Sequence, residues 1–148
     1  MNIVPPLGSG DIGWLKLRCA LWPEESEAEQ RSLMADAIAR GHYIRLATSS
    51  DGLVLAFVEA SKRVDYVNGT SSSPVAFLEG LYVVPEARRR GVARALVESV
   101  ASWARSMECT ELASDSLLDN TAAQEVHRAL AFRETERVVY FRRLLRDG

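Results

Sequence analysis

The sequence predicts an α+β (α/β) fold in which helices cover a mixed β-sheet. Segments rich in β-branched and aromatic residues follow one another across hairpin turns in residues 43–84. A strand, a helix and another strand then alternate in residues 75–116, a pattern typical of a parallel crossover. We therefore expect one domain over residues 1–148, with a mixed central sheet of six to seven strands flanked by about four helices.

The composition is that of an ordinary globular protein. With 148 residues, 47% of them hydrophobic and 26% charged, the chain can bury a core without disulfides or metals. The net charge of −2 argues against a nucleic-acid binder, for which a basic face is expected. No apolar run is long enough for a membrane span, and the first residues do not resemble a signal peptide, so we expect a cytoplasmic protein. Cys19 and Cys109 should be reduced thiols.

The first residues predict a short strand, a loop and a helix. The strand is expected over residues 2–4. Residues 8–13 match the dinucleotide-binding pattern GxGxxG, but a good preceding strand and an acidic residue about 20 positions further on are missing. We therefore favour a loop that enters a helix of residues 11–22, with Asp11 as its N-cap.

A second helix is predicted from Ser26, because Ser26 and Glu29 have the spacing of a capping box. It should end near Arg40, before Gly41. The acidic residues around its first turn either favour the helix dipole or recruit a cationic ligand. Trp22, at the end of the preceding helix, is either a core residue or an aromatic wall of a ligand site.

Three strands are predicted in the middle of the chain, over residues 43–48, 53–64 and 75–84. A Ser-Ser-Asp-Gly turn separates the first two, and an Asn-Gly pair in residues 66–74 turns the chain before the third. These strands should therefore be antiparallel neighbours.

The last third of the chain predicts two more helices and the remaining strands. Apolar residues recur every three or four positions over residues 92–107, which predicts a helix with one buried face. A strand is expected at residues 111–116, a helix at 121–130 and further strands within 132–145.

The most informative stretch is residues 79–93, where an apolar strand runs into a basic turn and then a helix. The first N–H groups of a helix have no intrahelical partner and point outward, which suits an anion and above all a phosphate. Gly91 allows close approach to the backbone. The Walker pattern GxxxxGK[ST] is missing, which argues against a nucleotide hydrolase.

Residues 88–93, Arg-Arg-Arg-Gly-Val-Ala, match the R/Q-x-x-G-x-G/A signature of the GNAT superfamily of acyl-CoA-dependent N-acyltransferases. The chain resembles this family over nearly its whole length, which implies the GNAT fold and acetyl-CoA as co-substrate, without a metal. The resemblance implies that the coenzyme pyrophosphate is held by Arg89, Arg90, Gly91, Val92, Ala93 and Arg94.

Further residues agree with the GNAT resemblance. Gly80 lies inside a strand, which often marks a bulge. In the GNAT fold a bulge there splays two parallel strands apart, and the resemblance implies that the pantetheine arm bonds to the backbone of Leu81, Tyr82 and Val83. Asn120 stands where members of the family often have an asparagine that contacts the pantetheine.

The segment from His127 to Phe132 resembles the family ending Y-x-x-x-G-F, with two departures. His127 stands for the tyrosine that usually acts as general acid, and Ala131 stands for the glycine. The first departure leaves the identity of the acid open.

Phrases spread along the chain resemble, more narrowly, the aminoglycoside 6'-N-acetyltransferases; they lie at residues 21–22, 66–70, 77–83, 113–115 and 134–141. The resemblance implies acetyl transfer to the 6'-amine of polycationic antibiotics, and hence antibiotic resistance. It also implies an acceptor pocket formed by Trp22, Tyr66, Glu79, Asp115 and Glu136. Carboxylates there would bind ammonium groups by charge-assisted hydrogen bonds. The alternative for each is a solvated carboxylate or a packed aromatic.

The mechanism follows from the chemistry of an amine acceptor. An ammonium group must lose a proton before it attacks a thioester, so a carboxylate or a linked water is needed as base. We expect Asp115 to be the catalytic base, with Glu79 as the second candidate. A backbone N–H near Leu81 would stabilise the oxyanion. Solvent, His127 or Tyr140 would protonate the leaving thiolate.

Two other functions stay open at this point. One is a GNAT enzyme that acts on another cationic amine, such as a polyamine, a lysine or a protein N-terminus. The other is a non-catalytic acyl-CoA-binding module. The apolar segment at residues 138–145 is expected to pair or exchange between the subunits of a homodimer.

Overall fold

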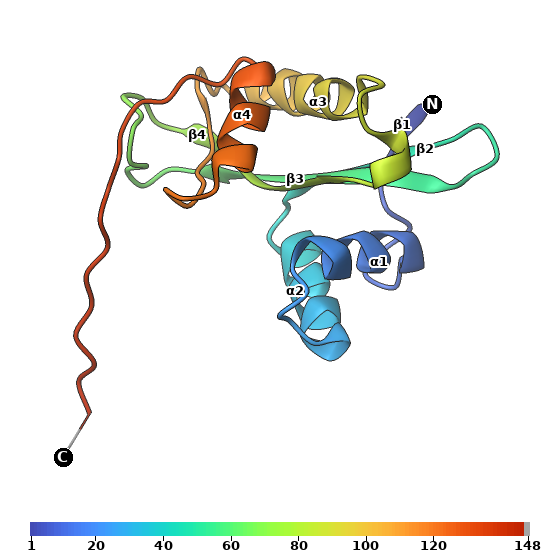
Figure 1. Cartoon of the computed structure of the whole chain (residues 1–148), viewed down its shortest axis with the longest axis horizontal. Coiled ribbons are helices and arrows are strands. Elements are labelled where there is room, and N and C mark those ends of the chain that lie inside the picture. Colours follow the sequence, from blue (N-terminus) through green and yellow to red (C-terminus); the bar gives the residue numbers. More distant parts are fainter. Residues whose placement is uncertain (147–148) are drawn as a thin grey trace. The chain divides into compact units, whose positions relative to one another are not determined.

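The computed structural model describes residues 1–146 and divides the chain into two compact units, Met1–Asp115 and Ser116–Gly148 (Figure 1). The first unit contains the whole β-sheet and three α-helices, and the second contains one α-helix followed by a long segment. The prediction of a single domain over the whole chain is not tested by this division and stays a prediction.

The sheet of the first unit has five strands in the order β1-β2-β3-β4-β5. The strands are β1 (Asn2–Val4), β2 (Tyr43–Thr48), β3 (Val54–Arg63), β4 (Val75–Val83) and β5 (Leu112–Ala113). Neighbours from β1 to β4 are antiparallel, whereas β4 and β5 are parallel, as the crossover pattern predicts. The expected count of six to seven strands is corrected to five in the described part of the chain.

The helices of the first unit cover both faces of this sheet. Figure 1 shows α1 (Ile12–Leu21) and α2 (Glu27–Ala39) below the sheet and α3 (Val92–Ser106) above it. The core on the first face contains Trp14, Leu15, Leu17, Met34, Ala37, Ile44, Leu46 and Phe57. The apolar stripe of α3 is buried on the other face, through Val92, Leu96, Val97, Val100 and Ala104.

Side-chain caps begin the two N-terminal helices where the sequence predicts them. Asp11 Oδ1 accepts from Trp14 N at 3.0 Å, and its Oδ2 accepts from Leu7 N at 2.9 Å. Ser26 and Glu29 form the complete capping box, each side chain accepting from the other residue's backbone N–H at 3.1 Å. The loop at residues 8–13 is therefore the entry to α1, which confirms the helix interpretation of the GxGxxG match.

A bulge interrupts the pairing of β3 with β4 at Glu79. Glu59 lies opposite Gly80 and Ala60 lies opposite Leu78, so Glu79 is an extra residue in β4. A bulge turns its extra side chain out of the regular alternation. The prediction that Gly80 marks a bulge is confirmed.

The parallel pair is short. β4 and β5 pair only at Ala76 with Leu112 and at Phe77 with Ala113 among the described residues, whereas β4 continues to Val83. The edge of β4 beyond Phe77 is thus not paired with β5, as expected for a splayed pair.

The second unit contains α4 (Thr121–Ala129) and the segment that follows it. Asn120 caps α4 by accepting from Ala123 N at 3.1 Å. Ala131, just beyond the helix, has φ +69°, a left-handed conformation that glycine adopts more easily. This conformation explains why the family pattern has a glycine there.

The expected strands within residues 132–145 are not formed: of the described residues, 132–146 contain neither helix nor strand. Nor does any described helix have the length and hydropathy required to span a bilayer.

Cys19 and Cys109 are unpaired, and burial raises the pKa of the Cys109 thiol.

Candidate active site

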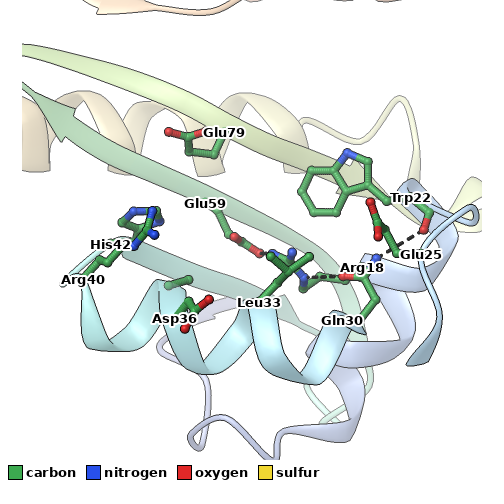
Figure 2. Close-up of a pocket in the computed structure, with 11 residues that line it drawn as sticks. Arg18, Trp22, Glu25, Gln30, Leu33, Asp36, Arg40, His42, Glu59 and Glu79 are labelled. Carbon is green, nitrogen blue, oxygen red and sulfur yellow. Dashed lines mark hydrogen bonds and ion pairs between the residues drawn. The ribbon is translucent and has the colours of Figure 1, made fainter. Parts of the chain in front are cut away.

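A cavity of about 300 Å³ lies in the first unit, between α1 and α2 on one side and β3 and β4 on the other. Figure 2 shows Trp22 and Glu79 on the sheet side of the cavity and Asp36 on α2 across from them. Carboxylates that line it are Glu25, Asp36, Glu59 and Glu79. An aromatic wall among carboxylates suits a cationic ligand.

Glu79 reaches the cavity because of the bulge in β4. Its Oε1 accepts from Ser61 Oγ at 2.5 Å and from Arg63 Nη2 at 2.9 Å. Its side chain is about a quarter exposed, at 27%. The carboxylate is thus oriented by the protein and still open to a ligand, which could approach its Oε2.

Trp22 is the C-cap of α1, where the backbone leaves the helix with φ −123° and ψ 71°. Its indole ring meets Phe57 edge to face at a centroid distance of 6.1 Å. It also lies directly over Gly80, because a Cβ atom there would be 2.6 Å from Trp22 Cη2. Gly80 therefore makes room for Trp22 beside the bulge, a role that the sequence does not reveal.

Glu25, which lines the cavity as Arg40 does, belongs to an acidic cluster with Glu24 and Glu29. A hydrogen bond with Glu29 raises the pKa of Glu25 above its ordinary value, and burial and the nearby charges of Glu29 and Glu24 add to the rise. Crowded carboxylates at an open rim attract a cation, which relieves their mutual repulsion.

The other predicted acceptor residues do not line this cavity. Tyr66 lies in the loop between β3 and β4 with 72% of its surface exposed. Asp115 follows β5 and is exposed. Glu136 is an exposed residue of the second unit. The cavity therefore brings together Trp22 and Glu79, whereas the roles of the other three stay predictions.

The loop that carries Tyr66 is tied to the residue before β5. Glu111 accepts from Ser71 N at 2.9 Å and from Ser72 Oγ. The hydrogen bond from Ser72 lowers the pKa of the Glu111 carboxyl most, and the hydrogen bond from Ser71 lowers it further. Glu111 is not among the predicted site residues. The only signal for it in the sequence is weak: an acidic residue directly before a strand.

The predicted pyrophosphate site lies at the start of α3. Gly91 is its N-cap with φ +79°, and it offers no side chain to the first helical N–H groups. Arg89 has φ +63°, a conformation that costs a non-glycine residue about 1 kcal/mol or more and that is typical of ligand-binding turns. Arg89, Arg90 and Arg94 are exposed beside this terminus, while Val92 is buried.

Arg88 is a residue of this turn that the predicted site leaves out. Its Nε donates to the carbonyl of Val83 at 2.8 Å, and its guanidinium lies 5.5 Å from the centre of the Tyr82 ring. Arg88 thus joins the basic turn to the end of β4. The carbonyl of Val83, a residue whose backbone is expected to bond the pantetheine, already accepts from this side chain.

In the second unit, three candidate residues are described by their local contacts. Asn120 uses Oδ1 to cap α4, so its expected contact with the pantetheine would add to a structural role. His127 Nδ1 donates to the carbonyl of Ala123 at 2.7 Å, and its ring packs on Phe132. Tyr140 is 80% exposed. These contacts favour a structural role for His127.

The sequence-based prediction of the site missed three residues that lie together, Arg18, Gln30 and Glu59. All three line the cavity and are buried. A signal for them exists: Arg18 is spaced four residues from Trp14 and from Trp22 on one helix face, and Glu59 interrupts an apolar strand.

Metal ligation finds no support in the described part of the chain. There, no group of three or more His, Cys, Asp or Glu side chains is arranged to hold a metal ion.

The bulged strand, the splayed parallel pair and the glycine-capped helix define the class of this protein. The model of the Acetyltransferase (GNAT) family matches residues 13–132, and the chain belongs to this family. The resemblance seen in residues 88–93 is thereby confirmed.

Within this family, the chain is similar to enzymes named for one substrate class. It is 48% identical to the aminoglycoside N(6')-acetyltransferase type 1 of Acinetobacter baumannii, over 97% of this chain and 98% of that protein. The protein of the same name from Salmonella typhimurium is 42% identical, over 88% and 90% of the two chains.

Solved structures agree. The apo crystal structure of the aminoglycoside antibiotic 6'-N-acetyltransferase AAC(6')-IG from Acinetobacter haemolyticus has a TM-score of 0.93 and 46% identity, covering 99% of this chain and 100% of that one. AAC(6')-Iy, solved in complex with the bisubstrate analog CoA-S-monomethyl-acetylneamine, has a TM-score of 0.83 and 42% identity, covering 89% and 90%.

Proposed function

We propose that this protein is an acetyl-CoA-dependent aminoglycoside 6'-N-acetyltransferase and thus an antibiotic-resistance enzyme. The observation that carries the proposal is the 48% identity with an enzyme of that name over nearly the whole of both chains. The cavity supports it, because an indole and several carboxylates suit an acceptor with several ammonium groups.

The acceptor site consists of Trp22, Tyr66, Glu79, Asp115 and Glu136. Glu79 binds an ammonium group through Oε2, since Oε1 is held by Ser61 and Arg63. Trp22 forms the aromatic wall beside it.

Acetyl-CoA is the co-substrate. Its pyrophosphate binds the turn from Arg89 to Arg94, where the N–H groups of Val92 and Ala93 begin α3 below a glycine cap. The pantetheine arm follows the backbone of Leu81, Tyr82 and Val83 along the β4 edge that β5 does not cover. Asn120, the N-cap of α4, is the further residue proposed to contact the pantetheine.

Transfer is direct within a ternary complex. Asp115 accepts a proton from the 6'-ammonium, with Glu79 as the alternative base. The free amine nitrogen then forms a bond to the thioester carbonyl carbon, and a backbone N–H near Leu81 stabilises the resulting oxyanion. The attacking nitrogen gives up its second proton to solvent, the C–S bond breaks, and the coenzyme thiolate leaves and takes up a proton from solvent or from an acid such as His127 or Tyr140.

The active form is a homodimer in the cytoplasm. Reduced thiols at Cys19 and Cys109 fit a reducing compartment. Bulky apolar side chains of the second unit are exposed in Val139, Tyr140, Phe141 and Leu145, which suits pairing with a second copy.

The decisive experiment is a thiol-release assay with acetyl-CoA and kanamycin, compared with a kanamycin analogue that has a 6'-hydroxyl group. We expect turnover with the amine and none with the hydroxyl analogue, because the latter lacks the attacking nitrogen. A panel of polyamines, peptides with free N-termini and lysine peptides serves as the comparison. Turnover confined to that panel would replace the aminoglycoside with another amine, and tight coenzyme binding without any turnover would indicate a binding module.

A further inference from the structure

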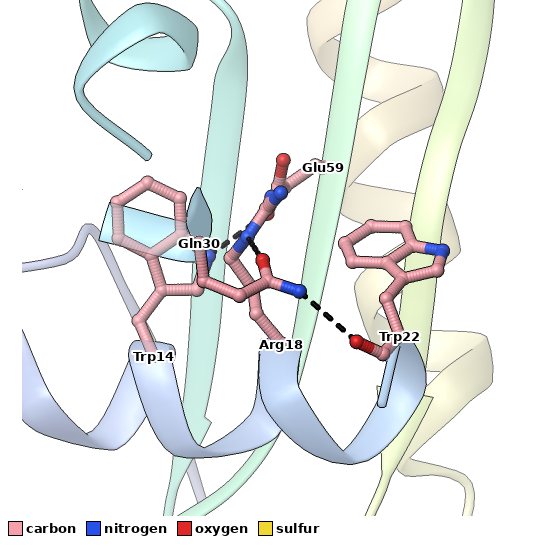
Figure 3. A network of polar contacts seen from close by, with 5 residues as sticks. All are labelled: Trp14, Arg18, Trp22, Gln30 and Glu59. Atoms are coloured by element: carbon pink, nitrogen blue, oxygen red, sulfur yellow. Dashed lines mark hydrogen bonds and ion pairs between the residues drawn. The ribbon is translucent and has the colours of Figure 1, made fainter. Parts of the chain in front are cut away.

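A buried polar network lies beside Trp22 and joins α1, α2 and β3 (Figure 3). Arg18 is its centre and is only 5% exposed, next to Glu59 at 3% and Gln30 at 0%. Arg18 Nη1 is paired with Glu59 Oε2, and Arg18 Nε donates to Gln30 Oε1 at 2.8 Å. Trp14 Nε1 donates to the same Glu59 oxygen at 2.9 Å.

Stability alone does not account for this network. Two buried charges lose their hydration, and well-packed apolar residues often replace such a pair without loss of stability. The contacts of the guanidinium indicate what else it does. Its Cζ lies 4.6 Å from the centre of the Trp22 ring, so a planar cation faces the indole.

The same network holds the backbone of Trp22. Gln30 Nε2 donates to the Trp22 carbonyl at 3.2 Å, which ties the end of α1 to α2. On the strand side the indole contacts Gly80, where a Cβ would approach to 2.6 Å. Trp22 is therefore held by Arg18, by Gln30 and by the bulged strand.

We propose that Arg18, fixed by Glu59 and Gln30, is a positioning residue that sets the place of the Trp22 indole and thereby the affinity for the acceptor. The proposal rests on the proposed function, in which Trp22 is a wall of the acceptor site. Acetyl-CoA affinity does not depend on Arg18, because the phosphate turn at Gly91 begins α3, on the other face of the sheet (Figure 1).

Arg18→Lys is the first test. Lysine keeps the positive charge beside Glu59 but lacks the flat fork that faces the indole and reaches Gln30 at the same time. We expect the KM for kanamycin to rise by at least about tenfold, equivalent to about 1.4 kcal/mol. The KM for acetyl-CoA and the kcat should stay unchanged, because only acceptor binding is lost.

Two further variants protect the test against a folding defect. The double variant Arg18→Met, Glu59→Gln leaves no buried charge, and a glutamine can still accept from Trp14 Nε1. Gly80→Ala displaces the indole from the strand side. Both should raise the KM for kanamycin as Arg18→Lys does. Arg31→Met is the matched control, since it removes an exposed pair with Glu27 on α2, and its kinetics should equal those of the wild type.

A spectroscopic readout reports the indole directly. In protein labelled with 5-fluorotryptophan, the Trp22 resonance is identified by Trp22→Phe. It should shift or broaden in Arg18→Lys and in Gly80→Ala. The Trp103 resonance is the internal reference, because that ring stacks on Tyr43 at 5.1 Å and should not move.

The outcomes separate this inference from the proposed function. A wild-type protein that acetylates no aminoglycoside overturns the proposed function and this role with it. An active wild type whose acceptor KM is the same in the Arg18 variants overturns the positioning role alone. So does an equal rise in both KM values, or a Trp22 resonance that stays in place.

Discussion

Glu79 and Asp115 differ in how far the protein has already engaged their carboxylates. Glu79 is held at Oε1 by Ser61 and Arg63, a geometry that fixes its direction. Asp115 is an exposed residue just after β5, where a proton accepted from the substrate can pass to water. Glu79 is therefore suited to binding an ammonium group, and Asp115 to accepting a proton.

Substitution of the two carboxylates should separate these roles. Asp115→Asn should lower kcat by about 10²- to 10⁴-fold, because it removes a general base. Glu79→Gln should instead raise the KM for kanamycin, since a charge-assisted hydrogen bond of about 1.5–3 kcal/mol is weakened. Steady-state kinetics with both substrates measure this. Wild-type activity in Asp115→Asn would remove Asp115 as the base, and a comparable loss of kcat in Glu79→Gln would give that role to Glu79.

At the junction of β4 with α3, Gly91 and Arg89 both have left-handed backbone conformations, and no side chain caps the first turn of α3. A Cβ atom at position 91 would project into open space, so steric contact does not explain why this residue is a glycine. What requires glycine is the conformation at φ +79° and the close approach of a phosphate to the backbone.

Gly91→Val should therefore raise the KM for acetyl-CoA and leave the KM for kanamycin unchanged. Gly52→Val is the matched control. Gly52 also has a left-handed φ, +86°, and open space, but it lies in the turn between β2 and β3. Both variants should lose similar stability in thermal unfolding. An unchanged KM for acetyl-CoA in Gly91→Val would move the phosphate site elsewhere.

For the molecule as a whole, the segment after α4 bears on the state of assembly. Its β-branched and aromatic residues are typical of a strand, yet the described residues 132–146 form none. Phe141 is 91% exposed and Leu145 is 90% exposed. A strand is stable only beside another strand, so a second copy of the chain is the partner that we expect.

Light scattering coupled to size-exclusion chromatography should accordingly give the mass of a dimer. The double variant Val139→Asp, Phe141→Asp should shift the protein to a monomer, because charges oppose burial of the segment. Leu7→Asp is the control, since Leu7 is 96% exposed but belongs to the first unit. A monomeric wild type, or a dimer that survives the double variant, would contradict the proposed assembly.

Local features of the fold were predictable from the sequence with good accuracy. Asp11 and the Ser26–Glu29 capping box begin their helices where expected, and α3 buries the predicted apolar stripe. These features depend on residues a few positions apart, so caps, turns and periodicity are sufficient to predict them. The basic turn at Gly91 is likewise a local feature that the sequence predicts.

Only the tertiary structure decided which distant side chains share the cavity. Arg18 meets Glu59, 41 residues away, and Gln30, 12 residues away, because strand register and helix packing bring three elements together. The bulge turns Glu79 into the same space, and Gly80 leaves room for Trp22. The sequence by itself determined the elements of the first unit, the basic turn at Gly91 and the family. The geometry of the cavity depends on long-range packing, which no local pattern encodes.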